Sequence, residues 1–285
     1  MIPSYINLEA LFDHYDAVFF DAYGVLVDRI DALRDAEQLV SLMNTSAMNY
    51  FIITNDASKS IESLSKTFHS QGMEVPFERI VNSGSLISGY YRDQDLAGRP
   101  TLVLGTTDSR AYVANSGGKV LGLDSGVEPD VILFGHSGPH DWESTLKYLL
   151  NLVSRRFKQK NPVRMVLPNP DFIYQNGPTE FGFGAAAFVE LLEEALLRLH
   201  GTHDVLRASK LGKPYPPIFI EAVRRAESDN AVMIGDQLET DVLGANNAGL
   251  DSAVVTTGIN KRSDPNEFKD MPDKLTPRYI LTSLV

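Results

Sequence analysis

Short apolar runs alternate with helical patterns along most of this chain, and each run ends in a polar residue or a glycine. "DAVFFD" (16–21) and "YFIITN" (50–55) are two such runs, and the segment between them, 31–44, is predicted to be a crossover helix. "AVMIGD" (231–236) and "SAVVTTG" (252–258) repeat the pattern further along the chain. Buried strands that alternate with helices are typical of βα units. The sequence therefore predicts an α/β fold with a mostly parallel sheet.

A second set of apolar runs lies between about residues 82 and 210, and includes "TLVLG" (101–105) and "DVILFG" (130–135). A continuous insertion of this size is predicted to form a small α/β domain of its own. The predicted organisation is a first domain built from residues 1–81 plus 211–285, with residues 82–210 as the inserted domain.

Composition narrows the classes of partner and chemistry. The 285 residues are 43% hydrophobic and 22% charged, with a formal net charge of −11 and no cysteine. These values are typical of a globular protein and exclude thiolate catalysis and disulfides. The acidic charge argues against nucleic acid or an anionic membrane as the main partner. No apolar run is long enough to span a membrane, and the first 16 residues do not resemble a secretion signal. We expect a cytoplasmic protein.

Polar residues at the ends of the predicted strands form the candidate site. Asp21 ends the first strand, Thr54 ends the second and Asp236 ends the third. Lys213 precedes a predicted helix, and Asp241 closes the string "GDQLETD". Taken alone, each of these acidic and hydroxyl side chains could cap a helix or a turn, and Lys213 could be a solvated turn residue. As an ordered set they predict one shared crevice, because the carboxyl ends of parallel strands meet at the same edge of a sheet.

This ordered set resembles the four motifs of the haloacid dehalogenase (HAD) superfamily. The resemblance narrows to its class IIA branch, the NagD-like or p-nitrophenylphosphatase-like sugar phosphatases. It rests on these strings: "FIITNDASKS" (51–60), "NPD" (169–171), "FGFGAAAFVELLE" (181–193), "GKPYPPIF" (212–219) and "MIGDQLETDVLGANNAG" (233–249). The family implies a Rossmann-like core with an α/β cap, and Mg²⁺-dependent hydrolysis of a small phosphate monoester such as a sugar phosphate. A homodimer formed through the cap would also fit the family.

The resemblance assigns a role to each acidic candidate. Asp21 would attack phosphorus and form an aspartyl-phosphate that water then hydrolyses. Mg²⁺ would be held by the carboxylates of Asp21 and Asp236 and by the backbone carbonyl of Tyr23. Asp241 would belong to the same metal site through water, or would orient Lys213.

The remaining candidates would contact the phosphoryl group or the rest of the substrate. The Thr54 hydroxyl, the Asn55 amide and the Lys213 ammonium would neutralise the transferring phosphoryl group. Asn169 and Asp171 end a predicted strand of the inserted domain and would line the site from the cap side, although a plain turn is the alternative for both.

Tyr23 departs from the family pattern, in which the residue two after the nucleophile is usually an aspartate that protonates the leaving group. A positioned general acid is worth roughly 10² to 10⁴ in rate, so its loss would slow a phosphatase markedly. Two roles stay open for Tyr23: a proton donor, or a residue that serves the metal only through its carbonyl.

Two alternative functions also stay open, beside transfer of the phosphoryl group to an acceptor other than water. The string "DAYG" (21–24) resembles the metal-free haloacid dehalogenases, and the missing acid would suit a low-turnover phosphate-binding protein. Clustered carboxylates raise one another's pKa values unless a cation compensates them. The acidic "GDQLETD" therefore favours Mg²⁺ and phosphorus chemistry over metal-free displacement at carbon.

Overall fold

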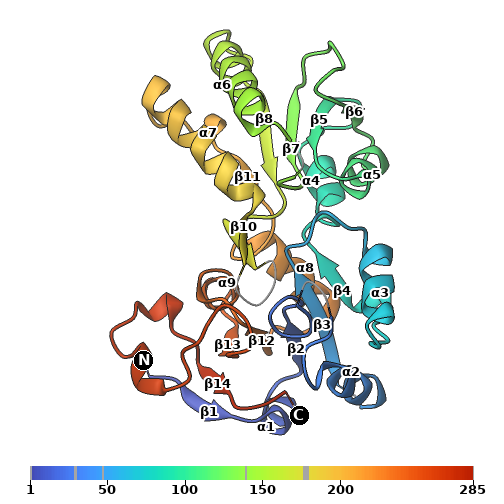
Figure 1. Ribbon diagram of the computed structural model, residues 1–285, viewed down its shortest axis with the longest axis vertical. Helices are drawn as coiled ribbons and strands as arrows, with labels where there is room; N and C mark the ends of the chain where they lie inside the picture. The colour runs from blue at the N-terminus through green and yellow to red at the C-terminus, as the bar shows by residue number, and fades with distance from the viewer. Residues whose placement is uncertain (1, 29–30, 47, 139, 176–179, 285) are drawn as a thin grey trace.

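The computed structural model shows two sheets, each flanked by helices, that lie one above the other along the long axis of the molecule (Figure 1). It describes residues 2–28, 31–46, 48–138, 140–175 and 180–284. We call the seven-stranded sheet and its helices the core, and the five-stranded sheet and its helices the cap. Every strand pairing described within these two sheets is parallel. The predicted α/β class is confirmed.

The core sheet has its strands in the order β1-β14-β13-β12-β2-β3-β4. These strands are β1 (Ser4–Ile6), β2 (Ala17–Phe20), β3 (Asn49–Thr54), β4 (Ile80–Asn82), β12 (Ala231–Gly235), β13 (Asp251–Val254) and β14 (Tyr279–Leu281). β2 lies between β12 and β3, so the carboxyl ends of these three strands are neighbours. This is the edge at which ligands bind in open parallel sheets.

Helices cover both faces of the core sheet. They are α1 (Leu8–His14), α2 (Ala36–Thr45), α3 (Ile61–Ser70), α8 (Pro216–Ala226) and α9 (Leu243–Asn247), with the π-helical turn η3 (Leu238–Val242) and the 3₁₀ turns η1 (Phe77–Arg79), η4 (Pro265–Phe268) and η5 (Asp273–Leu275). Because successive side chains of a strand point to opposite faces, Val18 and Phe20 pack on the side of α1, α2 and α3. Phe19 packs with α8 and α9 on the other side. All four residues of β2 are buried, which explains its uninterrupted apolar sequence.

The cap repeats this three-layer arrangement around a sheet with the order β11-β8-β7-β5-β6. Its strands are β5 (Pro100–Leu104), β6 (Lys119–Leu121), β7 (Val131–Phe134), β8 (Arg164–Leu167) and β11 (Ser209–Lys210). Its helical segments are α4 (Ile87–Asp93), α5 (Thr107–Asn115), α6 (Trp142–Lys158), α7 (Ala185–His200) and the 3₁₀ turn η2 (Asp204–Leu206). An antiparallel hairpin, β9 (Ile173–Gln175) and β10 (Phe181–Phe183), lies where the cap meets the core (Figure 1).

Two predicted elements are shorter than expected. The helix expected over 31–44 begins at Ala36, because Asp35 adopts a left-handed conformation with φ 69°. The strand expected over 252–258 ends at Val254, where the chain turns into the loop that packs against Asp236. Throughout the ranges that the structure describes, the helices are too short or too polar to cross a lipid bilayer.

Candidate active site

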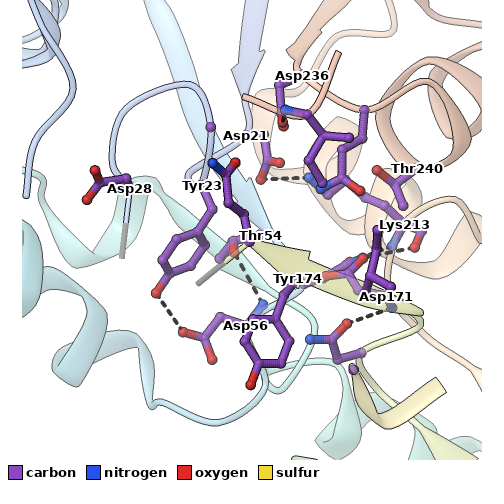
Figure 2. A pocket seen from close by; sticks show the side chains of 18 of the residues that line it. Asp21, Tyr23, Asp28, Thr54, Asp56, Asp171, Tyr174, Lys213, Asp236 and Thr240 are labelled. Atoms are coloured by element: carbon purple, nitrogen blue, oxygen red, sulfur yellow. Dashed lines mark hydrogen bonds and ion pairs between the residues drawn. The ribbon is translucent and has the colours of Figure 1, made fainter. Parts of the chain in front are cut away.

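The carboxyl ends of β2, β3 and β12 open into a cavity of about 370 Å³ between the core and the cap (Figure 2). Most of the predicted site residues line this cavity. They are Asp21, Tyr23, Thr54, Asn55, Asn169, Asp171, Lys213 and Asp236. Asp241 is fully buried beside them, in the π-helical turn η3, and reaches the cavity through Lys213. π-Helical turns are rare and occur frequently at functional sites.

Lys213 lies at the centre of the acidic cluster. Its ammonium nitrogen is 2.7 Å from Asp21 Oδ1 and 2.7 Å from Asp241 Oδ1. The Asn55 side chain holds the Lys213 backbone on both sides: Asn55 Oδ1 accepts from the Lys213 N–H at 2.7 Å, and Asn55 Nδ2 donates to the Lys213 carbonyl at 2.9 Å. The loop before α8 is thereby fastened to the end of β3, so the ammonium has a fixed position between the two carboxylates.

Burial and mutual repulsion shift the pKa values of this cluster. Burial by itself lowers the pKa of Lys213, but the carboxylates of Asp21 and Asp241 outweigh burial and raise it, so Lys213 stays an ammonium. Burial raises the pKa of Asp21 well above its usual value against the opposing effect of Lys213. Burial and the nearby Asp241 raise the pKa of Asp236 to about 7. One ammonium therefore does not compensate the three carboxylates.

The same carboxylates fit a divalent cation. One oxygen from each of Asp21, Asp236 and Asp241 lies within 4.8 Å of the others. Asp236 Oδ2 accepts from the Ile259 N–H at 2.6 Å, whereas Asp236 Oδ1 is buried and has no hydrogen-bond partner among the residues described. Asp241 uses both oxygens, for Lys213 and for the Gln237 N–H. An oxygen-only donor set with one unsatisfied buried carboxylate oxygen suits a hard cation such as Mg²⁺ or Ca²⁺.

The turn after β2 explains why a glycine follows Asp21 so closely. Gly24 has φ +85°, and its N–H donates to the Val27 carbonyl at 2.8 Å. A Cβ atom on Gly24 would lie 2.5 Å from the carboxyl carbon of Asp236. Only glycine allows the backbone of this turn to approach the acidic cluster so closely.

The Tyr23 side chain extends toward the loop that follows β3 (Figure 2). Its hydroxyl donates to Asp56 Oδ2 at 3.0 Å. The loop itself, residues 56–60, is bound by the cap at the start of α5: Thr106 donates its hydroxyl to the Ser58 carbonyl at 2.5 Å. The Ser60 N–H donates to Asp108 at 2.7 Å. The cap therefore fixes the loop that carries the Tyr23 partner.

On the cap side, Asn169 and Asp171 form a turn and also line the cavity. Asn169 Oδ1 accepts from the Asp171 N–H at 2.8 Å, and Asp171 Oδ1 accepts from Asn55 Nδ2 at 2.7 Å. Burial raises the pKa of Asp171 to about 6 against the opposing effect of that Asn55 hydrogen bond. Both N–H groups of the Asn55 amide are thus engaged, by Lys213 and by Asp171. A direct contact between this amide and a substrate would require one of these bonds to break.

Asp56, His136 and Tyr174 are among the further residues that line the cavity and were not predicted site residues. Asp56 directly follows the Thr54–Asn55 pair, so the motif itself could have indicated it. His136 follows the buried strand β7 of the cap. The rule that polar residues after buried parallel strands lie at the ligand-binding edge would therefore have indicated it. Tyr174 belongs to the hairpin β9–β10, whose three-residue strands leave no periodic signal in the sequence.

Comparisons with known proteins agree with this geometry. Residues 18–119 match the haloacid dehalogenase-like hydrolase family, and residues 210–284 match a HAD-hydrolase-like family. The ribonucleotide monophosphatase NagD of Escherichia coli K12 is 23% identical over 268 residues, which are 91% of this chain and 95% of that protein.

Solved structures extend the comparison to the whole fold. A possible sugar phosphatase of the HAD superfamily from Cytophaga hutchinsonii has a TM-score of 0.82, with 26% identity and 99% of both chains covered. A glycerol phosphate phosphatase from Mycobacterium tuberculosis in complex with magnesium has a TM-score of 0.78, with 24% identity over 96% of this chain and 77% of that one.

A parallel core sheet with an acidic cluster at its carboxyl edge, covered by an α/β cap, defines a haloacid dehalogenase-like hydrolase, and the chain belongs to this superfamily. Within the superfamily it belongs to the class IIA, NagD-like branch. The family matches identify the chain as a hydrolase.

Proposed function

We propose that this phosphohydrolase releases phosphate from a small phosphorylated metabolite, such as a sugar or polyol phosphate, with Mg²⁺ as its cofactor. The observation that carries the proposal is the Lys213 ammonium, 2.7 Å from both Asp21 and Asp241. A buried ammonium beside a carboxylate nucleophile is suited to neutralise a transferring phosphoryl group. The relatives named above, which act on ribonucleotide monophosphates and glycerol phosphate, support the substrate class.

Asp21 is the proposed nucleophile. Its carboxylate attacks phosphorus, the ester oxygen leaves, and water then cleaves the aspartyl-phosphate and restores the carboxylate. Thr54 and Lys213 would bind the phosphoryl oxygens. Thr54 Oγ1 accepts from the Asp56 N–H at 3.2 Å, so the Thr54 hydroxyl keeps its own proton to donate.

The carboxylates of Asp21 and Asp236 and the Tyr23 carbonyl are the proposed metal ligands. Bound Mg²⁺ would supply charge neutralisation to the phosphoryl oxygens. Asp241 would orient Lys213, because both of its oxygens are already engaged within the protein.

The cap residues Asn169 and Asp171 are proposed to shape the substrate side of the cavity, and Asn55 to hold both Asp171 and Lys213 in place. The proposal treats residues 82–210 as the cap inserted into a core of residues 1–81 plus 211–285. Separate parallel sheets in these two parts support it.

The proposal extends to a homodimer formed through the cap. Leu191 and Leu199 are about 60% exposed on the outer side of α7, which supports an apolar contact there. Light scattering on the purified protein tests this point: a monomer at all concentrations would contradict it.

The function is tested by phosphate release from p-nitrophenyl phosphate with Mg²⁺ or with EDTA. The nitrophenolate leaving group scarcely needs protonation, so this ester reports on the nucleophile and the metal alone. We expect turnover with Mg²⁺, its loss in EDTA, and a decrease of about 10⁴ or more in Asp21→Asn. Turnover no higher than that of the variant would contradict the proposal. Halide release and phosphate binding without turnover would then test the two alternatives.

A further inference from the structure

The cap wall of the cavity faces the oxygen that would leave the substrate. In phosphoryl transfer the attacking and leaving oxygens lie on opposite sides of phosphorus. The proposed nucleophile, Asp21, follows β2 of the core, so the departing oxygen would point toward the cap. Asp171 belongs to this wall of the cavity (Figure 2). An alcohol oxygen leaves readily only with a proton, and Tyr23, at the usual position of the acid, donates its own proton to Asp56.

Hydrogen bonds to the core hold Asp171 close to the reacting groups. Its Oδ1 accepts from Asn55 Nδ2 at 2.7 Å, and the same nitrogen donates to the Lys213 carbonyl at 2.9 Å. The Asp171 N–H donates to Asn169 Oδ1 at 2.8 Å, which fixes the turn. One amide nitrogen therefore joins Asp171 to the residue whose ammonium lies 2.7 Å from Asp21.

The second carboxyl oxygen of Asp171 is available to a ligand. Within the part of the chain that the structure describes, Oδ2 makes no hydrogen bond or ion pair, and it is not enclosed by protein. It is therefore open to the cavity that the residue lines. In a protonated carboxyl group one oxygen accepts and the other carries the proton. Because Oδ1 accepts from Asn55, the proton belongs on Oδ2, where it can be donated into the cavity.

The surroundings of Asp171 favour a protonated carboxyl group in slightly acidic solution. Burial raises the pKa of Asp171 to about 6, and the carboxylates of Asp241 and Asp56 act in the same direction. The Asn55 hydrogen bond and the Lys213 ammonium oppose this increase. A general acid is most effective when its pKa lies near the working pH, because it must hold a proton and also release it.

We propose that Asp171, from the cap, is the general acid that protonates the departing alcohol oxygen. This inference rests on the proposed phosphatase function. As an Asp21 oxygen bonds to phosphorus, the bond from phosphorus to the ester oxygen breaks, and the ester oxygen takes the Oδ2 proton and leaves as the alcohol. The Asp171 carboxylate then accepts a proton from the water that attacks the aspartyl-phosphate. Phosphate is released, the Asp21 carboxylate is restored, and Asp171 is protonated again.

Two esters of similar shape test the proposal, because benzyl phosphate releases a basic alkoxide and p-nitrophenyl phosphate a weakly basic nitrophenolate. In Asp171→Asn the amide oxygen can still accept from Asn55, but the NH₂ group is no acid. We expect kcat/KM for benzyl phosphate to fall by roughly 10² to 10⁴, and that for p-nitrophenyl phosphate to change less than about three-fold. Its kcat should still fall, because the second step loses its base. Rapid mixing should then show a burst of about one nitrophenolate per active site.

The pH profile separates proton donation from a structural role. In the wild type, the ratio of kcat/KM for benzyl phosphate to that for p-nitrophenyl phosphate should fall about ten-fold per pH unit above about pH 6, as Asp171 loses its proton. Groups that bind the metal or attack phosphorus act on both esters and cancel in this ratio. In Asp171→Asn the ratio should be low at every pH. Asn169→Ala, which loosens the same turn, is the control and should keep the wild-type pH dependence.

Three results would overturn the inference. Equal losses of kcat/KM for both esters in Asp171→Asn would show that Asp171 only shapes the site. An unchanged rate for benzyl phosphate in this variant, with a loss in His136→Gln, would assign the proton to the imidazole on the same wall. A wild type that hydrolyses p-nitrophenyl phosphate, but neither benzyl phosphate nor glycerol 3-phosphate, would show that the site has no working acid. Failure of the wild type to hydrolyse even p-nitrophenyl phosphate is distinct, because it would remove the phosphatase function itself.

Discussion

The two walls of the active-site cavity are built differently. On the core side, Asp21, Lys213 and Asp236 are at most 5% exposed and stand at the ends of buried parallel strands or beside them. On the cap side, part of the wall is β9, a three-residue strand whose antiparallel partner β10 carries Phe181 and Phe183, both about 60% exposed. The proposed chemistry thus depends on buried core residues whose replacement should destabilise the protein. The proposed choice of substrate depends on a more exposed part of the cap, which should tolerate substitutions.

The largest difference between the core and the cap should appear in the loss of stability when one lysine is replaced in each. Lys213→Met would leave Asp21 and Asp241 buried without their ammonium, and loss of one partner of a buried ion pair costs roughly 3 to 5 kcal/mol. Lys210→Met is the cap control, because its nitrogen is 3.9 Å from Glu190, a half-exposed carboxylate. A long ion pair with one half-exposed partner contributes roughly 0 to 1 kcal/mol. Urea unfolding of both variants measures the difference, and equal losses would refute it.

The pH dependence of stability should sharpen the comparison. Asp236 has a folded pKa near 7, above its ordinary value of 3.8, so the folded state holds this proton where the unfolded state has released it. The free energy of unfolding of the metal-free protein should therefore fall between about pH 4 and pH 7, by an amount on the order of a few kcal/mol. The raised pKa of Asp171 should lower the free energy of unfolding in the same way, but only up to about pH 6.

Urea unfolding at pH 5 and pH 8, without metal, checks this expectation. Asp236→Asn should lose less stability than the wild type between the two pH values, and Asp171→Asn should lack the part of the decrease that occurs below about pH 6. Saturating Mg²⁺ at pH 8 should restore stability to the wild type, because a ligand that binds only the folded state stabilises it. A pH-independent wild type would contradict the pKa assignment.

The smallest effect is expected in the cap wall. Tyr174 lines the cavity and packs over Gly182, where an added Cβ would lie 2.5 Å from the tyrosine ring. Tyr174→Ala should raise KM for the preferred metabolite about five-fold, the value of one hydrogen bond, with kcat for p-nitrophenyl phosphate unchanged. Tyr148→Ala, on the exposed surface of α6, is the control. Steady-state kinetics decides the point, and a large fall in kcat would place Tyr174 in the chemistry instead.

The sequence was informative where strands are long and buried on both faces. β2, β3 and β12 read as continuous apolar runs, so the polar residues after them could be placed at one edge of a sheet from the amino-acid pattern alone. β1 and β14 could not be predicted in this way, because three residues carry too little pattern. The family was predictable for the same reason, since its motifs lie at those strand ends.

Side-chain partners across the chain were beyond sequence reasoning. The Asn55 amide is hydrogen-bonded to the Lys213 backbone, which is 158 residues away in the sequence. Tyr23 is hydrogen-bonded to Asp56, which is 33 residues away. Residue type suggested that Asn55 binds substrate and left the role of Tyr23 open. Which groups these side chains donate to depends on how the loops pack, and that is settled only by the three-dimensional contacts. The assigned roles of the site residues stay predictions until the variants are measured.

The loop of residues 56–60 limits how the caps of related enzymes can be exchanged. It continues from β3 of the core, yet Thr106 and Asp108 of the cap bind its backbone. A chimaera that combined this core with the cap of a relative would lose those contacts unless the loop and the first turn of α5 were transplanted together. Recombination between members of the branch should therefore preserve these two segments as one inherited unit.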